Sequence, residues 1–246
     1  MEKKKIHEER NNLVVKSNEL IRNVRYSLTE QEQKIVIFLI SQIRKDDTEL
    51  NSIKLRLKDY CEIAGIEYYG GSISHLKDTI RNISNKSWWI SGTESNKEDL
   101  LRWIDTASLD GETVEIILSQ SLKPFILQLK ENFTKYEMIE VLALRGKYTI
   151  RLYEIFRSYL WLRKWRVKVD DLRDLIQCDK YKAFKEFNRN ILKYSTDEIN
   201  NYSGLEVSYV TIKKGRYIEE IEFDINEKQG YQMSIDMIMN RNARLG

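Results

Sequence analysis

The chain of 246 residues has few of the side chains that metal and nucleophilic chemistry use. Its two histidines, His7 and His75, are too far apart to form the His-x-His pair of a metal-dependent DNA-nicking enzyme. Its two cysteines, Cys61 and Cys178, form no CxxC pair and lie in apolar helical patterns, so we expect inert packing residues without a disulfide. No HExxH motif or Cys/His cluster offers a zinc site, and no pattern singles out a carboxylate site. We therefore expect no metal and no cofactor.

A phosphate-binding loop is also missing. The one Gly-Lys pair, at residues 146–147, is followed by tyrosine and lacks the first glycine of GxxxxGK[ST]. A nuclease or recombinase is a weak alternative, because no His or Arg constellation surrounds its possible nucleophiles, Tyr26, Tyr148 and Tyr153. The sequence therefore predicts no catalytic residues and a protein that is not an enzyme.

Long apolar runs are absent as well. The longest run near the start, Ile35 to Ile40, is far too short to span a membrane. The charged opening MEKKKIHEERNN has no apolar stretch behind it, which argues against a secretory signal. We expect a cytoplasmic bacterial protein with no membrane partner.

Charge is distributed unevenly along the chain. Residues 1–142 hold 21 basic and 23 acidic side chains, a net charge of −2, whereas residues 143–246 hold 20 and 15, a net charge of +5. The C-terminal part is therefore the better candidate for binding a polyanion.

The main positive signal is an internal repeat. Each half contains a strand-like alternation of apolar residues, namely Ile53, Leu55 and Leu57, and 112 residues later Trp165, Val167 and Val169. Short helices are expected to follow at Lys58 to Ile66 and Asp170 to Cys178, with Asp59 and Asp171 as N-caps. A second helix follows in each half, with apolar residues at matching spacing: Leu76, Ile80 and Ile83, and then Phe187, Ile191 and Tyr194.

Each repeat ends in a predicted β-hairpin and begins with an amphipathic helix. The hairpins are expected over Leu100 to Ser119, with a turn at Asp110-Gly111, and over Leu205 to Phe223, with a turn at Lys214-Gly215. The preceding helices are expected over Leu28 to Ile43 and Tyr148 to Trp161.

This order predicts an α+β fold with two tandem winged helices, a variant of the helix-turn-helix. We expect a first winged helix over residues 12–120 and a second over 143–228. A helical connector around Pro124 is expected over 121–142, and the tail 229–246 is a short helix or a disordered segment.

The second unit contains the better candidate for reading DNA. A helix from Tyr181 to Ser195 would bury a face made of Phe184, Phe187 and Ile191. Its opposite face would carry positive charge and an amide, from Lys182, Lys185, Arg189 and Lys193, with Asn188 on the flank. In a major groove, Arg and Lys can bond guanine O6 and N7, and Asn can bond adenine.

The hairpin tips of the two units differ in charge. The second tip carries Lys213, Lys214 and Arg216, which suit phosphate contacts or entry into a minor groove. In the first unit, Asp78 and Glu67 dilute the basic side chains Lys77 and Arg81, and the tip Asp110-Gly111-Glu112 is acidic. We expect the first unit to serve protein contacts instead.

Two stretches carry recognisable motifs. One is Asn12 to Ile43, with a "V-x-K-x-N-x-L" pattern followed by "L-T-x-x-E-Q-K" and an apolar helix. The other is Phe184 to Phe223, with a basic helix, an "E-I-N" helix end and a "K-K-G-R" wing. In both stretches the chain resembles the two-winged-helix replication initiators of iteron-containing bacterial plasmids. Some relatives carry a denser Arg run where Asn188 and Asn190 here flank Arg189, which leaves the base specificity open.

The resemblance implies a plasmid replication initiator. It implies that the C-terminal unit binds repeated double-stranded origin sites, called iterons, and that the N-terminal unit dimerises and touches DNA in the monomer. Monomers would start replication with a host initiator or helicase, and dimers would repress the protein's own gene or couple origins. The alternative is a winged-helix transcriptional repressor that starts no replication.

Overall fold

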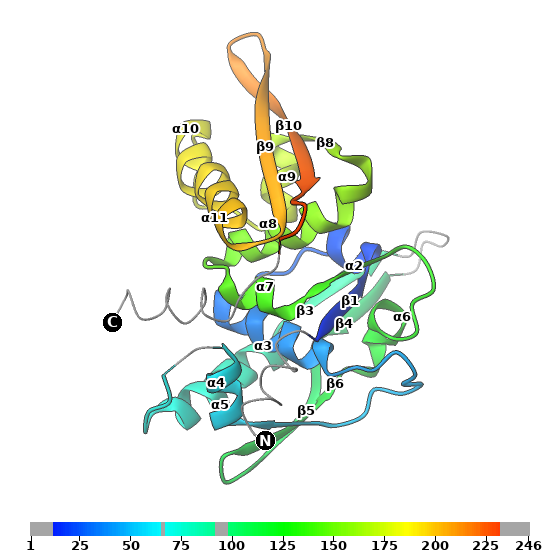
Figure 1. Ribbon diagram of the computed structural model, residues 1–246. Helices are drawn as coiled ribbons and strands as arrows, with labels where there is room; N and C mark the ends of the chain where they lie inside the picture. Colours follow the sequence, from blue (N-terminus) through cyan, green and yellow to red (C-terminus); the bar gives the residue numbers. More distant parts are fainter. Residues whose placement is uncertain (1–11, 65–66, 92–97, 232–246) are drawn as a thin grey trace.

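The chain forms two winged helices that pack against each other through one continuous core (Figure 1). The computed structural model describes residues 12–64, 67–91 and 98–231. Each unit has the predicted order of helix, strand, helix, helix and hairpin, so the α+β class with two tandem winged helices is confirmed. Most of the tail over 229–246 lies outside the described residues.

The first winged helix is built on a three-stranded antiparallel sheet with the strand order β2-β6-β5. Its helix α3 begins with a capping box: Thr29 Oγ1 accepts a hydrogen bond from the Glu32 amide, and the Glu32 carboxylate accepts one from the Thr29 amide. The "L-T-x-x-E" stretch is thus a helix start in physical terms. The elements are α3 (Glu30–Ser41), β2 (Ile53–Arg56), α4 (Leu57–Ala64), α5 (Ser72–Ser84), β5 (Ile104–Asp110) and β6 (Thr113–Leu118).

The second winged helix has the same arrangement, with the strand order β8-β10-β9. In both units the first strand pairs with the last strand of the hairpin, so that Leu55 lies opposite Val114 and Val167 lies opposite Ile221. The elements are α8 (Lys147–Tyr159), η2 (Leu160–Leu162), β8 (Lys164–Lys168), α9 (Val169–Leu175), α10 (Phe184–Phe187), η3 (Asn188–Lys193), α11 (Tyr194–Tyr202), β9 (Leu205–Lys214) and β10 (Tyr217–Glu227).

The first hairpin is shorter than the sequence predicts. The residues before Trp103 belong to β4 (Glu98–Arg102), which pairs with β3 (Ser87–Ser91) in a separate two-stranded sheet. Trp103 itself is fully buried at the change of direction between β4 and β5. The turn at Asp110-Gly111 is as predicted, and Gly111 has the positive φ of +57° that such turns require.

The expected N-caps are wrong. Strand β2 continues into α4 without a loop, and Asp59 lies inside the first turn, where its Oδ1 lies 2.6 Å from Arg56 Nη2. Strand β8 likewise continues into α9, whose N-cap position is Lys168, while Asp171 lies in the first turn. Because strand and helix are continuous, no loop residue precedes either helix to cap it. The two aspartates still favour these helices through the helix dipole.

The segment 121–142 is not the helical connector that we expected, because it also contains a strand. Strand β7 pairs with β1 near the start of the chain, joining residues more than a hundred positions apart. Pro124 lies in the first turn of α6, as predicted. The elements are β1 (Leu13–Ser17), α2 (Asn18–Arg22), η1 (Gln120–Leu122), α6 (Lys123–Ile126), β7 (Phe133–Glu137) and α7 (Met138–Ala143).

Helix α8 packs against both units, between which it lies in Figure 1. Its Phe156 ring lies 4.9 Å from the ring of Phe223 in the second sheet. On other faces of the same helix, Glu154 and Arg151 contact residues of the N-terminal segment. The buried apolar side chains of the two units form one continuous cluster. The division of the chain at residue 142 therefore stays a prediction.

A buried charged network joins α8 to the N-terminal segment. Lys16 Nζ lies 2.6 Å from Glu154 Oε1, and both side chains are almost fully buried. The hydroxyls of Tyr26 and Tyr136 also donate to this carboxylate. Burial disfavours the charged carboxylate, but Lys16 and Arg151 outweigh that effect and hold the pKa of Glu154 below its usual value.

Cys61 and Cys178 are buried and not joined in a disulfide, as the sequence predicts. In the described part of the chain, no helix is both long enough and apolar enough to cross a membrane.

Candidate nucleic-acid interface

A continuous helix over residues 184–202 presents the predicted basic face. It begins at Phe184, three residues later than expected, and continues through η3 and α11 to Tyr202. Phe187 and Ile191 are buried as predicted, and Phe184 is half-buried. The side chains of Lys185, Arg189 and Lys193 are exposed. Their spacing of four residues aligns them along the solvent side of the helix.

Lys182 lies outside this helix. It is exposed in the turn that joins α9 to α10, and its carbonyl oxygen accepts a hydrogen bond of 2.9 Å from Arg173 Nη2. The turn is therefore fixed to α9, and Lys182 stands just before the first residue of the basic row.

The middle of the helix, Asn188–Lys193, is a π-helical turn, which the sequence did not reveal. A π turn accommodates an extra residue and is frequently found at functional sites. Here Ile191 and Leu192 are both buried, while Arg189 and Lys193 on either side of them are exposed. A wheel at 100° per residue assumes a regular α-helix, so it did not identify Leu192 as a core residue.

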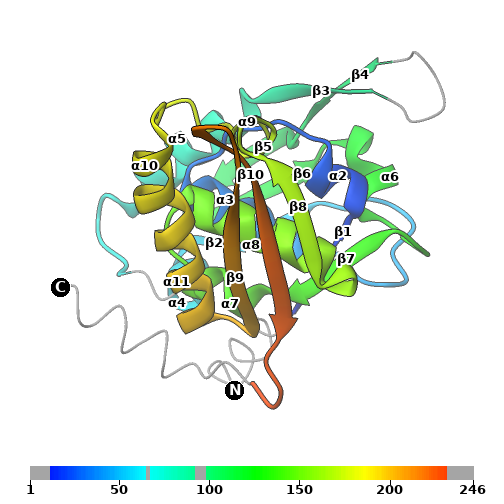
Figure 2. The same cartoon turned by 90° about the horizontal axis from the view of Figure 1, so that it is seen from above.

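Asn188 is half-buried and already has a partner within the protein. Its Oδ1 accepts a hydrogen bond of 2.7 Å from the hydroxyl of Tyr209 on β9. The bond ties the helix to the root of the hairpin, which lies beside it in both views (Figures 1 and 2). Sequence reasoning placed Asn188 correctly on the flank but missed Tyr209, because nothing local in the sequence links the two.

The β9-β10 hairpin forms a wing that projects from the body of the molecule (Figure 1). Its tip exposes all three predicted cations, Lys213, Lys214 and Arg216, around Gly215, whose φ is +64°. Lys214 Nζ lies 3.0 Å from Glu219 Oε1, so part of its charge is balanced within the wing. The sequence analysis did not single out Tyr217, whose side chain is 81% exposed next to Arg216.

The outer face of the second sheet contributes little net charge. Arg166 forms an ion pair with Glu220, and Lys164 Nζ lies 4.0 Å from Glu222 Oε1. The hydrogen bond from Arg166 to Glu220 and the charge of this carboxylate raise the pKa of the guanidinium. Lys164 and Arg166 are thus balanced by carboxylates within the sheet, whereas no such ion pair involves the exposed Lys185, Arg189 and Lys193 of the helix among the described residues.

The equivalent surface of the first unit, on α5 and the first hairpin, carries less positive charge. Arg81 on α5 forms an ion pair with Asp78, and Lys77 is exposed beside them. The hairpin tip is acidic, and Glu112 accepts a hydrogen bond from the Tyr68 hydroxyl.

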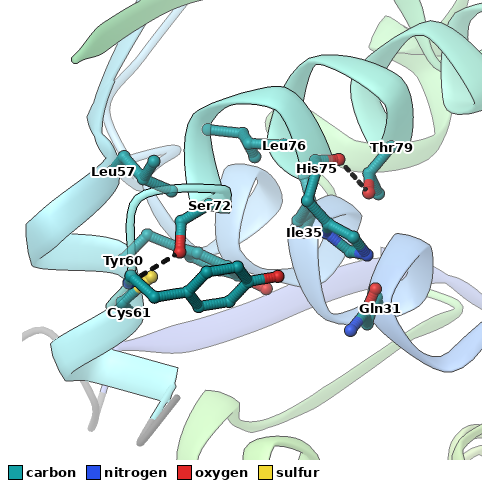
Figure 3. A pocket seen from close by; sticks show the side chains of 10 residues that line it. Gln31, Ile35, Leu57, Tyr60, Cys61, Ser72, His75, Leu76 and Thr79 are labelled. Carbon is teal, nitrogen blue, oxygen red and sulfur yellow. Dashed lines mark hydrogen bonds between the residues drawn. The ribbon is translucent and has the colours of Figure 1, made fainter. Parts of the chain in front are cut away.

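A small cavity lies between α3, α4 and α5 of the first unit (Figure 3). Its volume of about 100 Å³ is below the range of roughly 300–1,000 Å³ that is usual for small-molecule sites. In Figure 3 Cys61, His75 and Gln31 line its wall. Among the described residues, no group of three His, Cys, Asp or Glu side chains is placed to hold a metal ion.

Comparisons with known proteins cover most of the chain. The family model described as "Initiator Replication protein, WH1" matches residues 13–157, and "Initiator Rep protein, WH2" matches residues 168–225. A "Replication initiation protein" of Escherichia coli is 24% identical over 223 residues, which are 87% of this chain and 69% of the relative. An "Uncharacterized 27.6 kDa protein" of Escherichia coli is also 24% identical, over 88% of this chain and 95% of the relative.

The fold is similar to that of a solved structure. The Pi initiator protein, crystallised in complex with iteron DNA, superposes with a TM-score of 0.71 at 18% identity. The match covers 89% of this chain and 99% of that chain, so both winged helices are included.

Proposed function

Since this chain belongs to the Initiator Replication protein family, we propose that it binds repeated sites, or iterons, at a plasmid origin and starts replication there. The observation that carries this proposal is an exposed basic row on the helix, Lys185, Arg189 and Lys193, together with a basic tip on the wing that lies beside this helix (Figure 1). A helix in the major groove with a wing on the adjacent backbone is how such motifs contact DNA. The proposed activity requires binding and no catalytic group.

Within this surface we assign different roles to the helix and the wing. Arg189 and Lys185 would contact base edges, because the helix is the element that fits the major groove. Lys193 and Lys182 stand at the two ends of the basic row, where phosphates flank the groove. Lys213, Lys214 and Arg216 would contact phosphates and position the domain.

The experiment that tests this proposal is a titration of the full chain against direct repeats from the DNA that flanks its gene. A shuffled duplex of the same length and composition is the control. Specific binding should exceed binding to the shuffled duplex by about 10³-fold or more at physiological salt. Equal affinity for the two duplexes would refute iteron recognition.

The wing is expected to supply general affinity. Changing Lys213, Lys214 and Arg216 together to alanine should weaken binding to all sequences about equally. Each lost phosphate contact should also reduce the slope of log K against log salt by about 1. Lys214 should contribute least to this reduction in slope, because it is already paired with Glu219. Lys164→Ala, which removes a cation paired on the outer sheet face, should leave the slope unchanged.

An unchanged slope in the triple variant would show that the wing tip does not meet phosphates. The measurement is a series of binding isotherms at several salt concentrations for the wild type and the two variants.

We propose that the protein dimerises through its first unit. Trp89 on β3 lies opposite Leu100 on β4, and their side chains are 62% and 53% exposed. Together these two side chains form a small apolar patch on the surface. Exposed apolar patches of this kind mark protein contacts. A second copy of the chain is the partner that the family resemblance implies, and the dimer would repress the protein's own gene.

Sedimentation of the full chain tests the dimer. Trp89→Ser combined with Leu100→Ser should shift the protein to monomer at concentrations where the wild type is dimeric. Trp161→Ser is the matched control, since this tryptophan is 72% exposed in the second unit. The assignment is wrong if Trp161→Ser dissociates the dimer and the paired change does not. The full chain is needed because cutting at residue 142 would expose the buried charges of α8.

A transcriptional repressor with the same fold is the second candidate. Its binding surface would be the same, so binding measurements cannot separate the two functions. Replication of a plasmid that carries the origin separates them.

A further inference from the structure

The hydrogen bond between Tyr209 and Asn188 connects the wing to the basic helix at the residue next to Arg189. Tyr209 is half-buried at the root of the wing, where its ring lies 5.7 Å from the ring of Phe223. Its hydroxyl donates to Asn188 Oδ1 over 2.7 Å. Burial, with a smaller effect of Asp197, raises the pKa of Tyr209, so the phenol keeps its proton and remains a donor at neutral pH.

The bond is made at the first residue of the π turn. Asn188 begins the segment Asn188–Lys193, in which the regular helical repeat is interrupted. A π turn is a rare element inside α-helices and is frequent at functional sites. The contact from β9 joins the start of this turn to the wing, and it orients the Asn188 side chain through its oxygen.

We propose that Tyr209 makes Asn188 a specificity-determining residue by turning its carboxamide oxygen toward the wing and its nitrogen toward the DNA. This inference rests on the proposed function. An asparagine that reads adenine uses its oxygen to accept from N6 and its nitrogen to donate to N7. With the oxygen turned to Tyr209, Asn188 presents its amide donor to the groove, which fits an acceptor such as guanine O6 or N7, or thymine O4, and gives up the two-bond contact with adenine.

The inference changes the expectation drawn from the sequence, in which Asn188 was a candidate adenine reader. It also gives Tyr209 a role that does not require contact with DNA. Tyr209 is then a positioning residue, and its effect is transmitted through Asn188.

Tyr209→Phe tests the inference in the full chain, because it removes the hydroxyl and keeps the ring packed on Phe223. The probe is a panel of iteron duplexes in which each base pair is replaced in turn. The wild type should bind most weakly when one particular acceptor edge is replaced. At that position Tyr209→Phe should reduce the discrimination by about 3- to 10-fold, the size of one neutral hydrogen bond. Affinity for shuffled DNA should change less than about 2-fold.

Tyr159→Phe is the matched control. The Tyr159 ring stacks on Trp165 at 4.8 Å in the same aromatic cluster, at the end of α8 rather than against the basic helix. The Tyr159→Phe variant should discriminate among the duplexes of the panel as the wild type does. Asn188→Ala should lose discrimination at the same position as Tyr209→Phe, and the double variant should lose no more than Asn188→Ala alone.

Two results would overturn the inference while leaving the proposed function intact. One is a Tyr209→Phe variant that discriminates at every position as well as the wild type does. The other is a double variant whose losses multiply, because Tyr209 and Asn188 would then act independently. A wild type that binds iteron and shuffled duplexes equally would instead remove the proposed function, and this inference with it.

Discussion

Replacing Lys16 with methionine is expected to lower the free energy of unfolding by about 3–5 kcal/mol. The change leaves the Glu154 carboxylate buried without the cation that lies 2.6 Å from it. Arg151 and the two tyrosine hydroxyls remain, but they cannot supply the lost charge at that distance. A buried ion that loses its partner retains the full cost of its desolvation, which is why the expected effect is large.

The matched control is Lys123→Met, which breaks the ion pair between Lys123 and Glu49 at the surface. Exposed pairs of this kind contribute about 0–1 kcal/mol. Chemical denaturation of both variants, compared with the wild type, measures the difference. Adding Glu154→Gln to Lys16→Met should recover part of the lost stability, because the unpaired charge is removed. If Lys16→Met costs no more than Lys123→Met, the buried network does not join α8 to the N-terminal segment as described.

Arg189→Ala is expected to lower affinity for the iteron by about 5- to 150-fold, the equivalent of 1–3 kcal/mol for a bidentate contact with guanine. Affinity for shuffled DNA should fall much less, because a base contact carries sequence information and a phosphate contact does not. The thermal midpoint should barely move, since Arg189 is exposed on the face opposite the buried Phe187.

Two variants sharpen this prediction. Arg189→Lys should recover little, because a point charge cannot reproduce the planar fork of the guanidinium. Arg216→Ala at the wing tip is the matched control and should lower specific and general affinity by similar factors. Competition binding with iteron and shuffled duplexes measures how far each variant lowers the specific affinity and how far it lowers the general affinity. The helix is not the reader if Arg189→Ala unfolds the domain or lowers the two affinities by the same factor.

The architecture could be predicted from the sequence because its helices, strands and turns depend mainly on patterns of neighbouring residues. Alternating apolar residues such as Leu55 and Val167 recur at a fixed offset, and both are followed by amphipathic helices. The hairpin turns at Gly111 and Gly215 have the positive φ that their glycines suggested. The exposure of Lys185, Arg189 and Lys193 followed from the same periodicity.

What the sequence did not reveal depends on contacts between distant residues. Lys16 and Glu154 are 138 positions apart, and neither stands in a pattern that predicts burial of a charge. Asn188, the first residue of the π turn, is bonded to Tyr209, which is 21 positions further along the chain. The N-cap prediction at Asp59 and Asp171 failed for a local reason, because propensity identifies a helix start only when a loop precedes the helix.

The most direct test of the account is whether the protein lets an otherwise non-replicating plasmid persist. A plasmid that carries the repeats next to this gene, but no other origin, is introduced into a bacterial host with the gene supplied separately. We predict transformants with the wild-type protein and few or none with Arg189→Ala or with shuffled repeats. If the wild type binds the repeats tightly and yields no transformants in a host that maintains the natural plasmid, the protein is a repressor and the central claim is wrong.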